Sequence, residues 1–126
     1  MHRRTFCLGA LGAGLLVKAT TSQAAETYPS RAIRVVVPYP AGGGPDIMMR
    51  QFGPVLGAEL GQAVVVENKV GAGGVLAAQY VAHAPADGYT ALMGSNSHLI
   101  QKILQPKLNV DPLNDFVPVT IMGTSP

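Results

Sequence analysis

The 126-residue sequence contains no tryptophan, a single cysteine and only 13% charged residues. One cysteine, Cys7, excludes an intrachain disulfide. The apolar run Phe6–Val17 has twelve residues, whereas a membrane-spanning helix needs about 20. No basic tract suggests a nucleic-acid partner, and His83 and His98 have neither cysteine partners nor ligand-spaced acidic residues. We therefore expect no nucleic acid, no metal and no cofactor.

The amino-terminal segment has the parts of a secretory signal. Arg3 and Arg4 precede the apolar run, and small residues at Ser22 and Ala24 suit cleavage. Glycines interrupt the run, which disfavours the alternative of a buried helix. We predict that residues 1–24 are removed near Ala24 and that the chain is exported to the periplasm. The stretch "RRTFC" matches a twin-arginine signal only in part, so the choice between the general and the twin-arginine route stays open.

Removal of this signal changes the charge of the protein. Three of the nine basic residues lie before Ala24, so six remain against seven acidic residues, a net charge of −1 with histidine neutral. The only thiol leaves with the signal. Residues 25–126 suffice for one domain of modest size.

Strand and helix patterns alternate in the rest of the chain, which predicts an α/β fold with a parallel sheet. Gly61 is expected to end the first helix. We expect this helix to kink or break at Gly53–Pro54 and to turn Ile47, Met48, Phe52, Val55 and Leu56 inward. The predicted elements are strands Ala32–Val37, Ala63–Asn68, Thr90–Gly94 and Val117–Met122, helices Asp46–Leu60 and Val75–Ala84, and a helical turn within Asp111–Phe116.

The stretch "IRVVVPYPAGGGPD" (Ile33–Asp46) reads as a strand, a glycine loop and the start of a helix. Proline cannot donate to a strand ladder, and glycine permits close approach to the backbone. Free N–H groups at a helix amino terminus favour a bound anion. The alternative is a tight turn without a ligand.

Ligands of open α/β sheets lie beyond the carboxyl ends of the strands. Three loops leave those ends: Tyr39–Pro45, Lys69–Gly74 and Ser95–His98. The first and third offer neutral donors and contain no lysine or arginine. These donors are the side chains and amides of Ser95, Asn96 and Ser97, and the N–H groups of Gly42, Gly43, Gly44 and Asp46.

Catalytic motifs are weak or absent. No Gly-Lys-Ser/Thr follows the glycine loops, and "GAGGVL" lacks the last glycine of the dinucleotide pattern. "GSNSH" does not continue with the glycine of a nucleophile elbow. Asp46 suits stabilisation of the first helical turn better than the role of a base. We therefore expect a protein that is not an enzyme.

Four ordered blocks, "YPSRAIRVVVPYPAGGGPDIMMR", "GQAVVVENKVGAGG", "APADGYTALMGSNSH" and "DPLNDFVPVT", resemble the tripartite tricarboxylate transporter receptors, also called Bug-type extracytoplasmic solute-binding proteins. The resemblance runs from about Tyr28 to Pro126. It implies a type II periplasmic-binding-protein fold that captures a small carboxylate between two lobes and delivers it to the membrane permease subunits. Family members are more than twice as long. The expectation is therefore the first lobe, residues 25–126, of a truncated copy whose second lobe is missing.

The resemblance also implies the substrate-binding residues, which lie in two loops. Tyr39 stands where the family often has phenylalanine, Pro45 replaces a frequent threonine or other small residue, and the segment after His98 is one residue short. The implied residues are Tyr39, Ala41, Gly42, Gly43, Gly44, Asp46, Ser95, Asn96, Ser97 and His98. Two other readings stay open: a non-functional gene fragment, and an enzyme acting on an anionic substrate in the same crevice.

Overall fold

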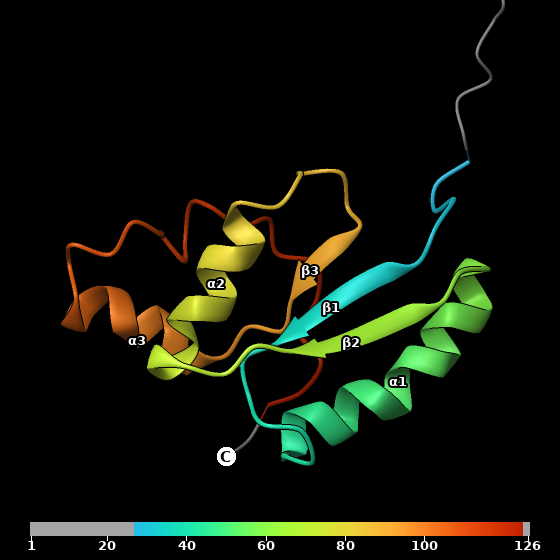
Figure 1. Ribbon diagram of the computed structural model, residues 1–126, viewed down its shortest axis with the longest axis horizontal. Coiled ribbons are helices and arrows are strands. Elements are labelled where there is room, and N and C mark those ends of the chain that lie inside the picture. Colours follow the sequence, from blue (N-terminus) through green and yellow to red (C-terminus); the bar gives the residue numbers. More distant parts are fainter. Residues whose placement is uncertain (1–26, 125–126) are drawn as a thin grey trace, which may run out of the picture.

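The computed structural model describes residues 27–124, so the predicted signal lies outside the described part of the chain. Figure 1 shows a small sheet between two helices, with a third helix beyond the tips of the strands. In chain order the elements are β1 (Ile33–Val37), α1 (Gly44–Leu60), β2 (Val64–Asn68), the 3₁₀ turn η1 (Ala72–Gly74), α2 (Val75–Ala82), β3 (Thr90–Leu92) and α3 (Asn96–Leu104).

The three strands form one parallel sheet in the order β2–β1–β3. Ile33 of β1 pairs with Val64 of β2, and Arg34 pairs with both Val65 and Thr90. Val36 and Val37 of the central strand are fully buried. The α/β class and the parallel sheet predicted from the sequence are confirmed.

Each face of the sheet carries one helix. A Cβ atom added at Gly53 of α1 would lie 3.6 Å from the Val64 carbonyl oxygen, so α1 approaches the backbone of β2 closely. On the other face, the Tyr80 hydroxyl of α2 accepts a hydrogen bond from Arg34. Both helices run beside the strands, and this leaves the carboxyl ends of the strands open to the connecting loops (Figure 1).

The prediction of which side chains of α1 are buried is wrong. The buried residues of this helix are Asp46, Met49 and Gly53. Gly53 and Gly57 carry no side chain, so the helix can lie close to β2, and the larger side chains are turned to its flanks. The exposed fractions are 48% for Ile47, 45% for Phe52, 63% for Val55 and 46% for Leu56, and Met48 is half-buried.

Helix α1 runs without a break through Pro54, so the predicted interruption does not divide it. Proline removes one amide donor from the helix ladder, that of the Arg50 carbonyl. Pro54 and Arg50 both lie on the exposed side, where water is available to replace that donor. Gly61 ends the helix in the left-handed conformation with φ of 68°, as predicted.

Two predictions for the last third of the chain need correction. Residues Ser95–His98, expected as a loop, are the cap and first turn of α3. Residues Val117–Met122 form no strand within the described chain, and Val117 and Val119 are each 89% exposed. A strand needs a neighbour that completes its hydrogen bonds, and the described residues place none beside this segment. The predicted helical turn near Asp111 is confirmed by the bond from the Asp115 amide to the Asp111 carbonyl, at 2.9 Å.

Candidate functional site

The loop between β1 and α1 is held by its own polar groups. The Gly43 amide donates to the Pro40 carbonyl at 3.1 Å, which closes a turn. The Gly42 amide donates to the Asp46 carboxylate at 2.8 Å. Gly42 has a φ of +83°, a conformation that side chains strain, so glycine is required at this point of the loop.

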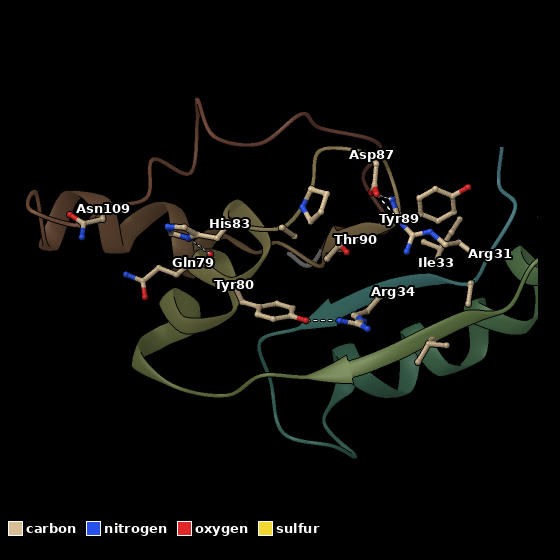
Figure 2. Close-up of a pocket in the computed structure, with 14 residues that line it drawn as sticks. Arg31, Ile33, Arg34, Gln79, Tyr80, His83, Asp87, Tyr89, Thr90 and Asn109 are labelled. Carbon is tan, nitrogen blue, oxygen red and sulfur yellow. Dashed lines mark hydrogen bonds and ion pairs between the residues drawn. The ribbon is translucent and has the colours of Figure 1, made fainter. Parts of the chain in front are cut away.

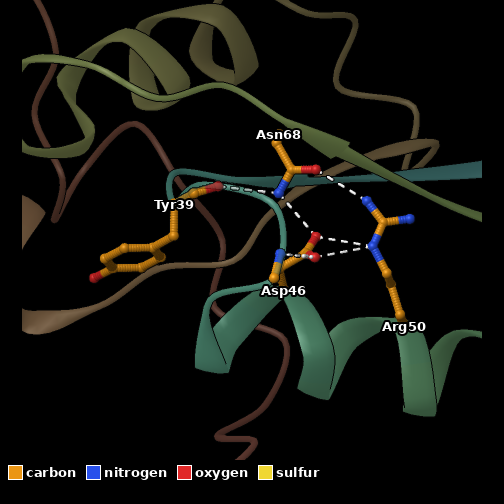
Figure 3. A network of polar contacts seen from close by, with 5 residues as sticks. Tyr39, Asp46, Arg50 and Asn68 are labelled. Atoms are coloured by element: carbon orange, nitrogen blue, oxygen red, sulfur yellow. Dashed lines mark hydrogen bonds and ion pairs between the residues drawn. The ribbon is translucent and has the colours of Figure 1, made fainter.

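Asp46 is the centre of the network in Figure 3. Its side chain is 2% exposed, and both carboxylate oxygens lie 3.0 Å from Nε of Arg50. The Asn68 amide donates to the same carboxylate at 2.8 Å. Hydrogen bonds from Arg50, the Gly42 amide and Asn68, in that order, lower the pKa of Asp46 from 3.8 to about 2. Asp46 is thus an ionised stabiliser of the first turn, as its sequence position suggests.

This network uses two of the donors that the sequence assigned to a ligand. The amides of Gly42 and Gly43 both have acceptors inside the loop. Within residues 27–124, the structure gives the Gly44 and Asp46 amides no acceptor. Pro45 between them has no N–H. A Cβ atom added at Gly44 would meet nothing within 4 Å, so the space beside this helix terminus is open.

The second half of the site is the amino terminus of α3. Ser95 precedes the helix in an extended conformation, and its amide donates to Nδ1 of His98 at 3.0 Å. A neutral His98 ring therefore carries its proton on Nε2. The ring is half-buried, stands edge-on to Phe116 at 6.5 Å, and burial lowers the pKa of His98 below its ordinary value. The ring is thus a neutral structural support of this helix start.

Tyr39 joins the two halves through a triangle of hydroxyl groups. Its hydroxyl donates to Ser95 Oγ at 2.7 Å and lies 3.2 Å from Ser97 Oγ. The two serine oxygens are 2.6 Å apart. Residues separated by more than fifty positions therefore present three hydroxyl groups at one point, where the chain leaves β1 and enters α3. Asn96 and Ala41 are exposed beside them.

The glycine-rich loop after β2 has an unusual backbone conformation. Gly71, Gly73 and Gly74 have positive φ, and the intervening Ala72 shares that rare conformation with φ of 47°. A Cβ atom at Gly74 would lie 3.4 Å from Pro38 and 3.8 Å from Cβ of His98. Gly74 therefore brings the loop after β2 into contact with the end of β1 and with the start of α3, where the donor groups lie.

A cavity of about 890 Å³ lies near the amino ends of the strands, away from these loops. Figure 2 shows that its two arginines, Arg31 and Arg34, already contact Asp87 and Tyr80. Arg31 binds Asp87 at 2.7 Å and stacks over Tyr89 at 4.2 Å. Arg34 contacts Tyr80 and, at 3.3 Å, Glu67. Because these cations already have partners, the cavity does not match the neutral-donor site predicted from the sequence.

Within residues 27–124, no three histidine, cysteine or acidic side chains come together as metal ligands. The same part of the chain contains no helix long and apolar enough to cross a bilayer.

Comparison with known proteins relates this geometry to a family. Residues 48–126 match the family described as "Tripartite tricarboxylate transporter family receptor". BugT of Bordetella pertussis is 43% identical over 104 residues, which are 81% of this chain and 32% of BugT. The chain spans about a third of the length of the curated relatives it matches.

Two solved structures share the fold. MatC from Rhodopseudomonas palustris, solved with bound malate, has a TM-score of 0.68 and 43% identity over 73% of this chain and 32% of MatC. A second protein of R. palustris, solved with adipate, has a TM-score of 0.52 and 42% identity over 53% of this chain and 22% of its own. Sequence and fold agree: the chain belongs to the tripartite tricarboxylate transporter receptor family, and its fold is that of one lobe of a periplasmic binding protein.

Proposed function

We propose that this chain captures a small carboxylate at the carboxyl ends of its strands, as the solute-binding component of a tripartite tricarboxylate-type transporter. The observation that carries the proposal is the hydroxyl triangle of Tyr39, Ser95 and Ser97. Its three protons are shared among the three oxygens, and an arriving carboxylate accepts them instead. Charge-assisted hydrogen bonds of this kind contribute about 1.5–3 kcal/mol each where they are shielded from water.

Backbone dipoles support the same role. The α3 amides of Asn96 and Ser97 have no acceptor among the described residues, like those of Gly44 and Asp46 in α1. Each helix start favours negative charge, by about 0.3–1 kcal/mol where the group is exposed. Because neither loop contains lysine or arginine, the site binds its anion through neutral groups alone. Related proteins hold malate and adipate, which are both dicarboxylates.

The remaining assignments follow from this role. Residues 1–24 act as an export signal, and residues 25–126 form the first lobe of a solute-binding domain in the periplasm. The partners are the carboxylate and the permease subunits of the transporter. The role is capture without catalysis, because the hydroxyl groups of Ser95 and Ser97 contact Tyr39 and each other, and His98 turns Nδ1 toward a backbone amide.

Nuclear magnetic resonance of the ¹⁵N-labelled chain tests the proposal, because amide shifts detect even millimolar binding. Addition of malate or adipate is expected to give saturable shifts at Gly44, Ser95 and Ser97. Tyr39→Phe removes one hydroxyl donor and weakens binding about two- to tenfold, the equivalent of about 0.5–1.5 kcal/mol. Tyr80→Phe, which removes a hydroxyl that contacts Arg34 and none of the groups of the site, is the matched control. Shifts confined to the cavity around Arg34, or equal affinities of the two variants, contradict the proposal.

A further inference from the structure

We propose that Asn68 is a positioning residue for solute capture, which holds both donor groups of the site from the end of a strand that contributes no donor itself. This inference rests on the proposed function. Asn68 is the last residue of β2, and its side-chain amide reaches across to the loop that follows β1 (Figure 3).

All polar atoms of the Asn68 side chain have partners. Nδ2 donates to the Tyr39 carbonyl at 3.0 Å and to the Asp46 carboxylate at 2.8 Å. Oδ1 accepts from the Arg50 guanidinium at 3.0 Å. A rotated amide would turn its oxygen toward the carboxylate and the carbonyl, so only one orientation satisfies all three partners. The side chain therefore fixes the relative position of β2, the loop and α1.

The two groups that Asn68 holds belong to different parts of the site. Tyr39 carries the hydroxyl that contacts Ser95 and Ser97, and its carbonyl is one of the two acceptors. Asp46 lies in the first turn of α1, where the amides of Gly44 and Asp46 have no acceptor among the described residues, and its carboxylate is the other acceptor. One side chain thus sets the hydroxyl triangle and the helix terminus relative to each other. A site fixed before the ligand arrives loses less conformational freedom on binding, which raises affinity.

Asn68→Asp is the sharpest test because it keeps the shape of the side chain and its contact with Arg50. The aspartate oxygen that replaces Nδ2 faces the Tyr39 carbonyl and the Asp46 carboxylate without a proton to donate. At pH 7.5 we expect the affinity for malate and adipate, measured by amide shifts on the full chain, to fall at least about tenfold. As the pH falls toward 5, protonation of the introduced carboxyl restores a donor, so the affinity ratio of variant to unaltered chain rises.

Two control variants separate positioning from charge and from stability. Asn109→Asp makes the same charge change at an exposed asparagine that follows α3 and takes no part in the network of Asn68, and its affinity is expected to match the unaltered chain. Val75→Ala weakens the core at a buried position of α2 without touching the network. If it lowers the melting temperature as much as Asn68→Asp does, yet keeps full affinity, the loss at Asn68 is a loss of positioning.

The outcomes are distinguishable. Saturable binding by the unaltered chain, together with an unchanged affinity or a ratio independent of pH in Asn68→Asp, overturns the positioning role and leaves carboxylate capture intact. Equal losses of affinity in Asn68→Asp and Val75→Ala overturn it as well. No shift at Gly44, Ser95 or Ser97 in the unaltered chain overturns the proposed function, and the positioning role falls with it.

Discussion

A negative charge placed at Gly44 tests the proposed anion site without damage to the fold. Gly44 opens α1, and a Cβ atom there meets nothing within 4 Å. Gly43 is a poorer choice, because an added Cβ would lie 3.2 Å from the Pro40 carbonyl and disturb the loop itself. Gly44→Asp therefore changes the charge of the site while the helix keeps its geometry.

The two effects of Gly44→Asp have opposite signs. A side chain at a helical glycine position adds about 0.5–1 kcal/mol of stability, and an acidic group in the first turn adds about 0.3–1 kcal/mol. A carboxylate bound beside Gly44 meets a like charge at about 5 Å, which costs about 0.8 kcal/mol in bulk water and about 3 kcal/mol near a protein surface. The expected loss of affinity is about fourfold to more than a hundredfold.

The assay pairs thermal unfolding with an amide-shift titration of malate. Gly44→Ala is the control, because it adds the Cβ atom and keeps the site uncharged. We expect both variants to melt at or above the temperature of the unaltered chain, with affinity lost only in Gly44→Asp. A Gly44→Asp chain that melts normally and binds as tightly as Gly44→Ala would refute the placement of the anion at this helix start.

Three further predictions concern stability and processing. The folded pKa of Asp46, about 2, lies below its ordinary value of 3.8, so the contribution of Asp46 to stability is present above pH 3.8 and is lost as the pH falls through about 2. Asp46→Asn is expected to lower the urea midpoint at pH 7 and to flatten the decline of that midpoint below pH 4, and a parallel decline in both chains contradicts this. Gly61→Ala places a Cβ atom at φ of 68° and costs about 1–2 kcal/mol, measured by urea unfolding. Gly44→Ala is the control for an added methyl group, because a Cβ atom there meets nothing within 4 Å, and an equal cost in both variants contradicts the prediction. Intact-mass analysis of the periplasmic fraction is expected to show a chain that starts near Ala25, and a chain found only at full length in the cytoplasm argues against export.

The sequence predicts the three strands that form, because their signals are local, and is wrong for the fourth, Val117–Met122. The β-branched runs around Val36 and Val66 and the left-handed cap at Gly61 need no knowledge of distant residues. The buried face of α1 is different, because it depends on how closely the helix approaches β2. Gly53 and Gly57 permit that approach, so the face with the largest side chains is not the buried one. Apolar spacing alone cannot reveal this choice.

The candidate site shows the same division. The sequence identifies Tyr39, Ser95 and Ser97 as candidates because they are polar residues at strand ends. Their mutual contacts depend on the fold, which brings together residues 56 and 58 positions apart. Arg50 and Asn68 were missed. The spacing of Asp46 and Arg50 by four residues is a signal for an ion pair on one helix face. Asn68 gave no local signal, because its role depends on the register that sets β2 beside β1.

The pairing of Asp46 makes the proposed anion site compatible with an acidic residue at the start of α1. A bare carboxylate at the start of α1 would occupy the positive end of the helix and repel a second anion. Arg50 lies 3.0 Å from it, so the pair is neutral, and the carboxylate points into the protein toward Asn68. Because the pKa of Asp46 is held near 2, this balance does not change at any pH from 5 to 8. The acidic residue thus fixes the loop from within and leaves the amides of Gly44 and Asp46 without an acceptor in the protein, as the proposed capture of an anion requires.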